Sequence, residues 1–268
     1  MNGTRILDFS RVLAGPWATQ MLADQGAEVI KVEPPGGDET RAFAPLVDGV
    51  STYFLSANRN KRSIELDLHN PVGRSAALAL AGRADVVVEN FRPGVMARLG
   101  LSWETLSALN PRLVYVAIHA FGEEGGEEWV KRPGYDLVLQ AMGGAMSFTG
   151  FPGSPPIRAG APVADLFAGL HAVQAVLLGL LDRERTGKGT KTVVNMMQVQ
   201  LGALVYHATR HAVTGEAEGP RGNAHRGLVP YDIYPCADGW IALACGNDGI
   251  WRRLVAALDL AAPRAWST

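Results

Sequence analysis

Short apolar runs alternate with longer amphipathic stretches along most of the chain. Ile6–Phe9 forms the first short apolar run, and Pro16–Ala23 is predicted as a helix with proline in its first turn. Gly26 ends that helix, and Glu28–Glu33 has the composition of a second strand. This spacing predicts a β-α-β unit with parallel strands.

The same alternation then repeats. Asn70 is a helix cap by sequence, with Pro71 at the first helical position, and Ser102 caps a later helix in the same way. The repeated order of strand and helix predicts an α/β fold with a doubly wound, Rossmann-like parallel sheet. The further strands expected in this part are Ser63–Leu68, Asp85–Glu89 and Leu113–Ile118.

The later part of the chain predicts three further helices and a change of domain. Helices are expected at Tyr135–Met142, from Asp165 to the charged turn near Gly187, and at Met196–His211, with a strand at Lys191–Asn195. We predict a large domain over residues 1–212, a glycine-rich linker over 213–227, and a partial, smaller α+β domain over 228–268. The smaller domain is expected to contain strands at 231–234 and 240–244 and a helix at 251–260.

Composition changes this picture little. The chain has 268 residues, 47% of them hydrophobic and 19% charged, and a net charge of −1, so neither a nucleic-acid partner nor an anionic membrane surface is expected. Cys236 and Cys245 are too few for a disulfide framework and do not have a metal-ligand spacing. The N-terminus lacks the apolar run of a signal peptide. We therefore expect a cytoplasmic protein.

Leu166–Leu181 is almost entirely apolar. It is shorter than the ~20 residues that a helix needs to span a bilayer. We interpret it as a buried core helix and expect no membrane insertion.

Several common catalytic patterns are missing from the sequence. The loop after the first strand has no G-x-G-x-x-G, and R-T-G-K-G-T-K-T lacks the full glycine spacing of a phosphate loop. No G-x-S-x-G is present. His207 and His211 are four residues apart without H-E-x-x-H, so no metal site is predicted.

Asp165 stands where a loop rich in glycine and proline enters the long apolar helix. An aspartate there can cap the helix by accepting backbone N–H bonds. It can also be an anion held by the helix N-terminus and available as a covalent nucleophile. Local spacing favours the cap and leaves the nucleophile open.

Two polar loops are candidates for binding an anionic ligand. Arg59-Asn60-Lys61 comes just before a predicted strand, and Asn90-Phe91-Arg92 follows another. Ligands of open α/β sheets bind beyond the carboxyl ends of the strands, so the second loop is well placed. Both loops can equally be solvated turns.

Taken in order, the longer motifs resemble the family III CoA-transferases, the CaiB/BaiF group. The motifs that carry the resemblance are D-F-S-R-V-L-A-G-P-W-A-T-Q-M-L-A-D-Q-G-A-E-V-I-K-V-E, N-R-N-K-R-S-I-E-L-D-L, A-D-V-V-V-E-N-F-R-P-G and R-P-G-Y-D. The resemblance runs from Ile6 to about Leu254. It implies transfer of coenzyme A from an acyl-CoA to a free carboxylic acid.

The resemblance also implies roles for single residues. Asp165, in A-P-V-A-D-L-F-A-G, matches the aspartate that forms first a mixed anhydride and then an aspartyl-CoA thioester. Tyr135, Asp136 and Arg11 are implied as residues lining the substrate site. The positions matched to coenzyme A binding are Val12, Leu13, Arg59, Asn60, Lys61, Asn90, Phe91 and Arg98.

This sequence departs from the family pattern at two phosphate-contact positions. Pro34 stands where other members have an arginine, and Pro133 stands where some have a lysine. We therefore expect the phosphate contacts to be distributed differently here.

The family has a sibling activity, the racemisation of 2-methylacyl-CoA. Racemases have G-H-D where this chain has Gly134-Tyr135-Asp136, so transfer is favoured over racemisation. Coenzyme A is expected as substrate and product, with no metal.

Relatives are longer and form interlinked homodimers. The resemblance therefore implies a homodimer and a chain that ends inside the small domain. A shortened, non-catalytic CoA-binding remnant is the alternative to an active enzyme.

Overall fold

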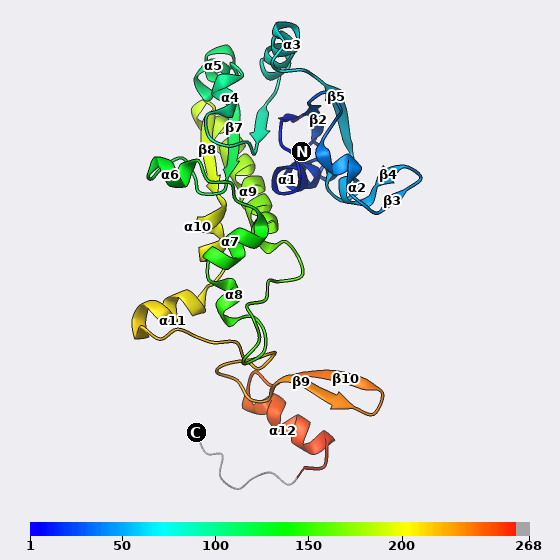
Figure 1. Cartoon of the computed structure of the whole chain (residues 1–268), viewed down its shortest axis with the longest axis vertical. Helices are drawn as coiled ribbons and strands as arrows, with labels where there is room; N and C mark the ends of the chain where they lie inside the picture. The colour runs from blue at the N-terminus through cyan, green and yellow to red at the C-terminus, as the bar shows by residue number, and fades with distance from the viewer. Residues whose placement is uncertain (261–268) are drawn as a thin grey trace. The chain divides into compact units, whose positions relative to one another are not determined.

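The computed structural model describes residues 1–260, and these divide into two compact units (Figure 1). The first unit comprises residues 1–144 and 159–215. The second comprises residues 145–158 together with the described residues from 216 onward. The sequence A-A-P-R-A-W-S-T, predicted as part of the small domain, lies outside the described residues.

A six-stranded parallel sheet forms the centre of the first unit. Its strand order is β5-β2-β1-β6-β7-β8, so the chain moves outward in one direction from β1 and then returns to build the other half from β6. This is the doubly wound order of a Rossmann-like fold, and the predicted fold class is confirmed. The strands are β1 (Arg5–Asp8), β2 (Glu28–Glu33), β5 (Lys61–Glu65), β6 (Val86–Glu89), β7 (Val114–His119) and β8 (Thr190–Asn195).

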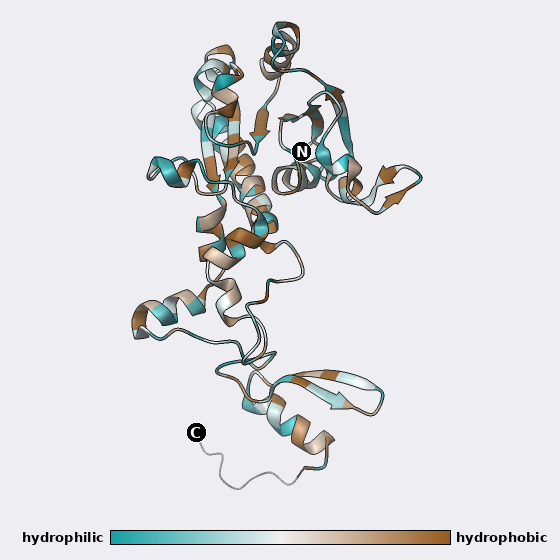
Figure 2. Ribbon diagram, viewed as in Figure 1, coloured by the Kyte–Doolittle hydropathy of each residue, from teal (hydrophilic) through white to brown (hydrophobic). Residues whose placement is uncertain are grey.

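The central strands are buried on both faces, which explains their continuous apolar runs. All four residues of β6 and all six of β7 are buried, whereas the edge strand β5 is largely exposed. Figure 2 shows the same contrast, with hydrophobic colouring along β6 and mostly hydrophilic colouring along β5. Val86 and Val88 belong to one hydrophobic core and Val87 to the other, as the alternation of a strand requires.

Helices cover the two faces of the sheet. On one face lie α1 (Ala14–Asp24) and α9 (Val163–Thr186), and on the other lie α3 (Pro71–Ala81) and α5 (Trp103–Leu109). The predicted caps are confirmed. Asn70 accepts a hydrogen bond from the N–H of Val72, and Ser102 accepts one from the N–H of Thr105.

Helix α9 packs closely against the sheet through small residues. A Cβ atom added to Gly179 would lie 2.6 Å from Cγ1 of Val114, and one added to Gly169 would lie 2.9 Å from the carbonyl oxygen of Ala14. By length and composition alone, α9 could cross a membrane. A core helix passes the same test, and the small residues of α9 are buried against β7 and α1.

Shorter elements connect the larger ones. The predicted single helix over Met196–His211 was wrong, because Val205 has a positive φ of 47° and divides the segment in two. The shorter elements of the first unit are η1 (Glu39–Ala42), β3 (Leu46–Val47), β4 (Val50–Ser51), α2 (Thr52–Asn58), α4 (Val95–Arg98), α6 (Glu127–Val130), α7 (Asp136–Met142), α10 (Met196–Gly202) and α11 (Tyr206–Thr214).

The second unit contains an antiparallel hairpin and two helices: α8 (Ala145–Phe148), β9 (Tyr231–Cys236), β10 (Gly239–Ala244) and α12 (Asp248–Ala257). Residues 145–158, which the sequence placed in the large domain, belong here. The N–H of Gly222 donates to the carbonyl of Gly150 at 2.7 Å. The ring of Phe151 packs where Gly222 has no side chain. Part of the predicted linker is therefore built into this unit.

Candidate active site

The site predicted from the sequence lies where the strand order reverses, between β1 and β6. Open α/β sheets bind ligands at such a switch point, beyond the carboxyl ends of the strands. The loop after β1 begins at Phe9 and contains Arg11, Val12 and Leu13. The loop after β6 begins at Asn90.

A cavity of about 180 Å³ opens between these two loops, the segment that leads into α7 and the start of α9. It brings together residues that are far apart in the sequence. The predicted residues that line it are Arg11, Val12, Leu13, Asn90, Phe91, Tyr135 and Asp165.

Asp165 is the third residue of α9, and its side chain does not cap the helix. The N-cap position is Pro162, and no side-chain cap bond is formed there. The cap, which local spacing favoured as one of two interpretations, is therefore wrong. Its carboxylate has no hydrogen-bond partner among the described residues, although it lies in the first helical turn.

Asp136 caps α9 from a different helix. One oxygen of its carboxylate accepts from the N–H of Ala164 at 2.8 Å, and the other accepts from the amide of Gln140 at 2.7 Å. Gln140 in turn accepts from the N–H of Ala159 at 2.9 Å. Asp136 thus supplies the capping bond that Pro162, at the N-cap position of α9, cannot make with a side chain.

Burial, and after it the negative charge of Asp136, together raise the pKa of Asp165 to about 7. Burial and then the charge of Asp165 also raise the pKa of Tyr53. Tyr53 on α2 is therefore within electrostatic range of Asp165. Tyr53 was not predicted as a site residue, because helix α2 was not predicted.

Tyr135 precedes α7 and is 73% exposed, with its side chain at the cavity. The glycine before it allows a close approach to the end of β7. A Cβ atom on Gly134 would lie 2.3 Å from the Cβ of Ala120. Only glycine therefore fits at this point of the G-Y-D motif.

The loop after β6 is held by its own strand. Glu89, which is buried, accepts from the N–H of Phe91 at 2.7 Å. The guanidinium of Arg11 lies over the ring of Phe91, 5.6 Å from its centroid. The amide of Asn90 bonds to the backbone of Arg11 across the switch point.

A second cavity of about 630 Å³ adjoins the first, since Arg11, Phe91 and Arg92 line both. Arg98 lines this larger cavity, as does Pro34, which stands at a predicted phosphate-contact position. The segment after β5 contributes Leu66, Asp67, Leu68 and His69, none of which was predicted as a site residue. The strand was expected to extend to Leu68, whereas β5 ends at Glu65, so these residues lie just beyond its carboxyl end.

The prediction for Arg59, Asn60 and Lys61 is not borne out by the geometry, since none of them lines either cavity. Arg59 and Asn60 both bind Asp24. They precede β5 and therefore lie at the amino edge of the sheet, opposite the edge where ligands bind.

Lys61 is buried with its ammonium paired. Its Nζ lies 3.0 Å from the carboxylate of Asp8 and donates to the carbonyl of Pro16 at 2.8 Å. Burial lowers the pKa of Lys61 to about 8. Despite burial, which opposes ionisation, Lys61 and Lys31 hold the pKa of Asp8 at about 2.

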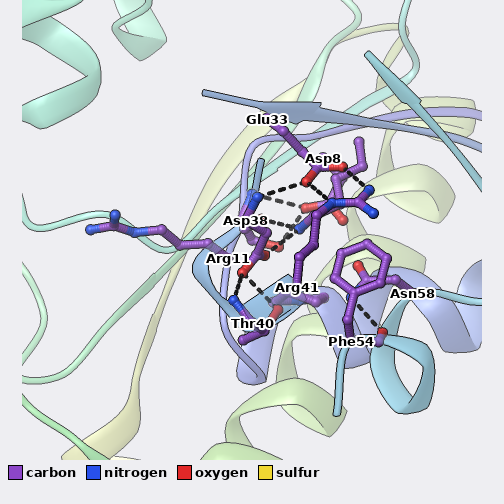
Figure 3. A network of polar contacts seen from close by, with 12 residues as sticks. Asp8, Arg11, Glu33, Asp38, Thr40, Arg41, Phe54 and Asn58 are labelled. Carbon is purple, nitrogen blue, oxygen red and sulfur yellow. Dashed lines mark hydrogen bonds and ion pairs between the residues drawn. The ribbon is translucent and has the colours of Figure 1, made fainter. Parts of the chain in front are cut away.

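These groups are part of a charged network beside the larger cavity (Figure 3). Lys31 pairs with Asp38 at 2.9 Å, and Arg41 pairs with Glu33 at 2.6 Å. Lys31, Glu33 and Asp38 are at most 3% exposed. The network therefore fixes the wall of the cavity formed by the end of β2.

Three comparisons place the chain among known proteins. The model of "CoA-transferase family III" matches residues 1–267. The succinate–glutarate CoA-transferase of Agrobacterium fabrum is 43% identical over 98% of this chain, and the acetyl-CoA:oxalate CoA-transferase of Acetobacter aceti is 41% identical over 94%. The chain spans 67% and 65% of the lengths of these relatives.

Solved structures agree with this assignment. A CaiB/BaiF family protein from Brucella suis aligns with 97% of this chain and 69% of its own, at 40% identity and a TM-score of 0.88. Rv3272 from Mycobacterium tuberculosis aligns with 97% of this chain and 69% of its own, at 36% identity and a TM-score of 0.85. The chain belongs to CoA-transferase family III.

Proposed function

We propose that this chain transfers coenzyme A from an acyl-CoA to a free carboxylic acid, with Asp165 as the covalent nucleophile. The observation that carries the proposal is the free carboxylate of Asp165, which lines the switch-point cavity without a hydrogen-bond partner among the described residues. Membership of the family supports the same chemistry.

In the first half-reaction, a carboxylate oxygen of Asp165 attacks the thioester carbon. The C–S bond breaks, CoA leaves as a thiolate, and a mixed anhydride remains. The thiolate then attacks the side-chain carbonyl carbon of Asp165, which releases the donor acid and forms an aspartyl-CoA thioester.

The second half-reaction reverses these steps with the acceptor. Its carboxylate attacks the aspartyl thioester, the thiolate leaves, and a second anhydride forms. Attack of the thiolate on the acceptor acyl carbon gives the new acyl-CoA and restores the carboxylate of Asp165. The bonds formed and broken in these steps balance without an oxidant or a metal.

The electrostatics of the cavity support Asp165 in this role. A pKa of about 7, raised first by burial and then by Asp136, makes the ionised carboxylate a stronger nucleophile than an exposed aspartate. A large part of it is still ionised near neutral pH. Tyr135, at the position of the racemase histidine, offers a phenol, which is a weaker base than imidazole near neutral pH.

We propose that CoA extends over both cavities, with the thioester near Asp165 and the nucleotide end in the larger cavity. Arg98 and Arg92 line the larger cavity and are exposed, so both are available to phosphates. The acceptor class we propose is a short dicarboxylic acid. Relatives are named for glutarate, oxalate and mesaconate, and Arg11 and Arg132 line the smaller cavity as counter-charges.

Steady-state transfer from succinyl-CoA to a panel of carboxylic acids tests the proposal. Asp165→Asn should abolish transfer. The matched control is Asp182→Asn, on the same helix, where the acid pairs with Arg185 outside both cavities. This control should keep full activity. Undiminished transfer by Asp165→Asn would rule out the nucleophile. The homodimer implied by the resemblance stays a prediction, which analytical ultracentrifugation tests.

A further inference from the structure

The turn after β1 contains a backbone conformation that its sequence disfavours. Val12 has a φ of 66°, in the left-handed region. A β-branched residue is a clear outlier there, because its Cβ crowds the neighbouring carbonyl. Such a conformation persists only where the surrounding structure holds it, and it is concentrated at functional sites.

Side chains from β1, from β2 and from the loop after β6 hold the two residues before Val12. The carboxylate of Asp8 accepts from the N–H of Ser10 at 2.9 Å, and Nζ of Lys31 donates to the carbonyl of Ser10 at 2.7 Å. Asn90 holds the next residue, Arg11, by both of its backbone groups. Every backbone polar group of Ser10 and Arg11 is therefore bonded to a side chain.

The amide of Asn90 matches the backbone of Arg11 as a neighbouring strand would. Its Oδ1 accepts from the N–H of Arg11 at 2.9 Å, and its Nδ2 donates to the carbonyl of Arg11 at 2.7 Å. The opposite amide orientation would set donor against donor and acceptor against acceptor, so this pairing fixes the side chain. The contact joins β1 to β6 at the switch point.

Directly after this clamp, α1 begins without a side-chain cap. Val12, Leu13 and Ala14 all line the cavity that contains Asp165. A change in the Arg11–Val12 backbone would therefore move a wall of the cavity that Asp165 also lines. Asn90 itself also lines the cavity, so a direct contact with CoA is the rival role.

We propose that Asn90 is a positioning residue: it holds the Arg11–Val12 turn in its left-handed conformation and so aligns the cavity wall for attack by Asp165. This inference rests on the proposed function, which it deepens. On this proposal, loss of the Asn90 side chain lowers kcat because the backbone of Val12 moves. The rival role predicts an effect on CoA affinity alone.

A double-mutant cycle between Asn90→Ala and Val12→Gly tests the inference. Glycine adopts a positive φ readily, so a glycine at position 12 needs the clamp less. We expect Asn90→Ala to lower kcat on the order of 10–100-fold, as small misplacements of reacting groups do. In the Val12→Gly background the same change should cost only about threefold or less, an energetic coupling between the two positions.

The control is Asn110→Ala. Asn110 also donates from its side chain to a backbone carbonyl of another segment, Ala84, at 2.8 Å, but it lines neither cavity. It should lower the Tm without changing kcat, and it should show no coupling to Val12→Gly. A loss of kcat in Asn90→Ala that Val12→Gly does not rescue would overturn the proposal. So would a raised KM for the acyl-CoA with unchanged kcat.

Amide hydrogen exchange separates this inference from the proposed function. If the unaltered chain transfers no CoA, the proposed function fails while the clamp is still tested. Exchange at Arg11 and Val12 should then be at least about tenfold faster in Asn90→Ala than in Asn110→Ala. Equal exchange rates in the two variants would overturn the clamp.

Discussion

Asp136 caps helix α9 and Asp165 is the proposed nucleophile, whereas the sequence left both roles open for Asp165. Asp136 accepts the hydrogen bond from the N–H of Ala164 near the start of α9, and Asp165 keeps a free carboxylate at the cavity. Local spacing cannot distinguish these roles, because both acids stand at the start of a helix. The distinction depends on α7 and α9 lying together in the folded chain.

The charge of Asp136 should contribute, after burial, to the pH dependence of transfer. In Asp136→Asn the amide oxygen can still accept from Ala164, while the negative charge beside Asp165 is lost along with the bond from Gln140. Because that charge raises the pKa of Asp165, its removal should shift the acidic limb of kcat/KM to lower pH. A pH–rate profile measures this shift. With Asp182→Asn as control, an unshifted limb in both variants would contradict the electrostatic role.

The ionised carboxylate of Asp165 should also lower the free energy of unfolding at neutral pH and above. Its pKa is 3.8 in the unfolded chain and about 7 in the folded one, because burial disfavours the charged form. The folded state therefore holds its proton more tightly, and stability falls as pH rises from about 4 through about 7.

Asp165→Asn mimics the neutral acid and should remove this loss. At pH 8 we expect it to raise the free energy of unfolding on the order of 1–3 kcal/mol, allowing for partial exposure. Near pH 4 the difference should disappear. Urea unfolding at the two pH values measures it, and a destabilised variant at pH 8 would contradict the buried, unpaired carboxylate.

At the scale of elements, strands were predictable where burial on both faces dictates the sequence. Glu28–Glu33 was predicted with its observed bounds, and the buried runs of β6 and β7 were recognised to within one or two residues. Helix α2 was missed, and the break at Val205 was hidden, because tertiary contacts and a non-glycine positive φ leave no local signal.

The loops of the candidate site were also predictable only in part. The predicted residues that follow β1 and β6 line the cavities, because the carboxyl ends of parallel strands meet at one edge. Arg59 and Asn60 precede β5 and lie at the opposite edge, whereas His69 follows that strand and lines the larger cavity. Basic residues alone do not reveal which edge a loop occupies.

Close packing of α9 on the sheet gives a stability prediction. Gly179→Ala places a Cβ atom 2.6 Å from Val114, in a wall of β7 that cannot retreat without moving the sheet. We expect a loss on the order of 1–3 kcal/mol in the free energy of unfolding, typical of overpacking. Gly202→Ala is the control, because nothing lies within 4 Å of its added Cβ. Equal stability of the two variants would contradict the close approach.

At the scale of the whole molecule, the motif order identified the family where single motifs did not. The pattern of elements and the glycine-rich segment after them predicted a large domain over 1–212, while the structure adds residues 145–158 to the second unit and takes the first unit to residue 215. Those boundaries depend on contacts such as the bond between Gly222 and Gly150, which no local pattern records. The chain spans 67% and 65% of the lengths of the CoA-transferases of Agrobacterium fabrum and Acetobacter aceti, so its own activity has to be measured.

Intact-mass spectrometry of the full chain shows directly whether Asp165 carries CoA covalently. After incubation with succinyl-CoA and no acceptor, the chain should gain the mass of CoA less one water, and peptide mapping should locate the adduct at Asp165. The adduct should be removed by hydroxylamine and be missing from Asp165→Asn. An adduct that persists in Asp165→Asn would show that Asp165 does not carry CoA. An unaltered chain that turns over substrate without forming an adduct would show the same.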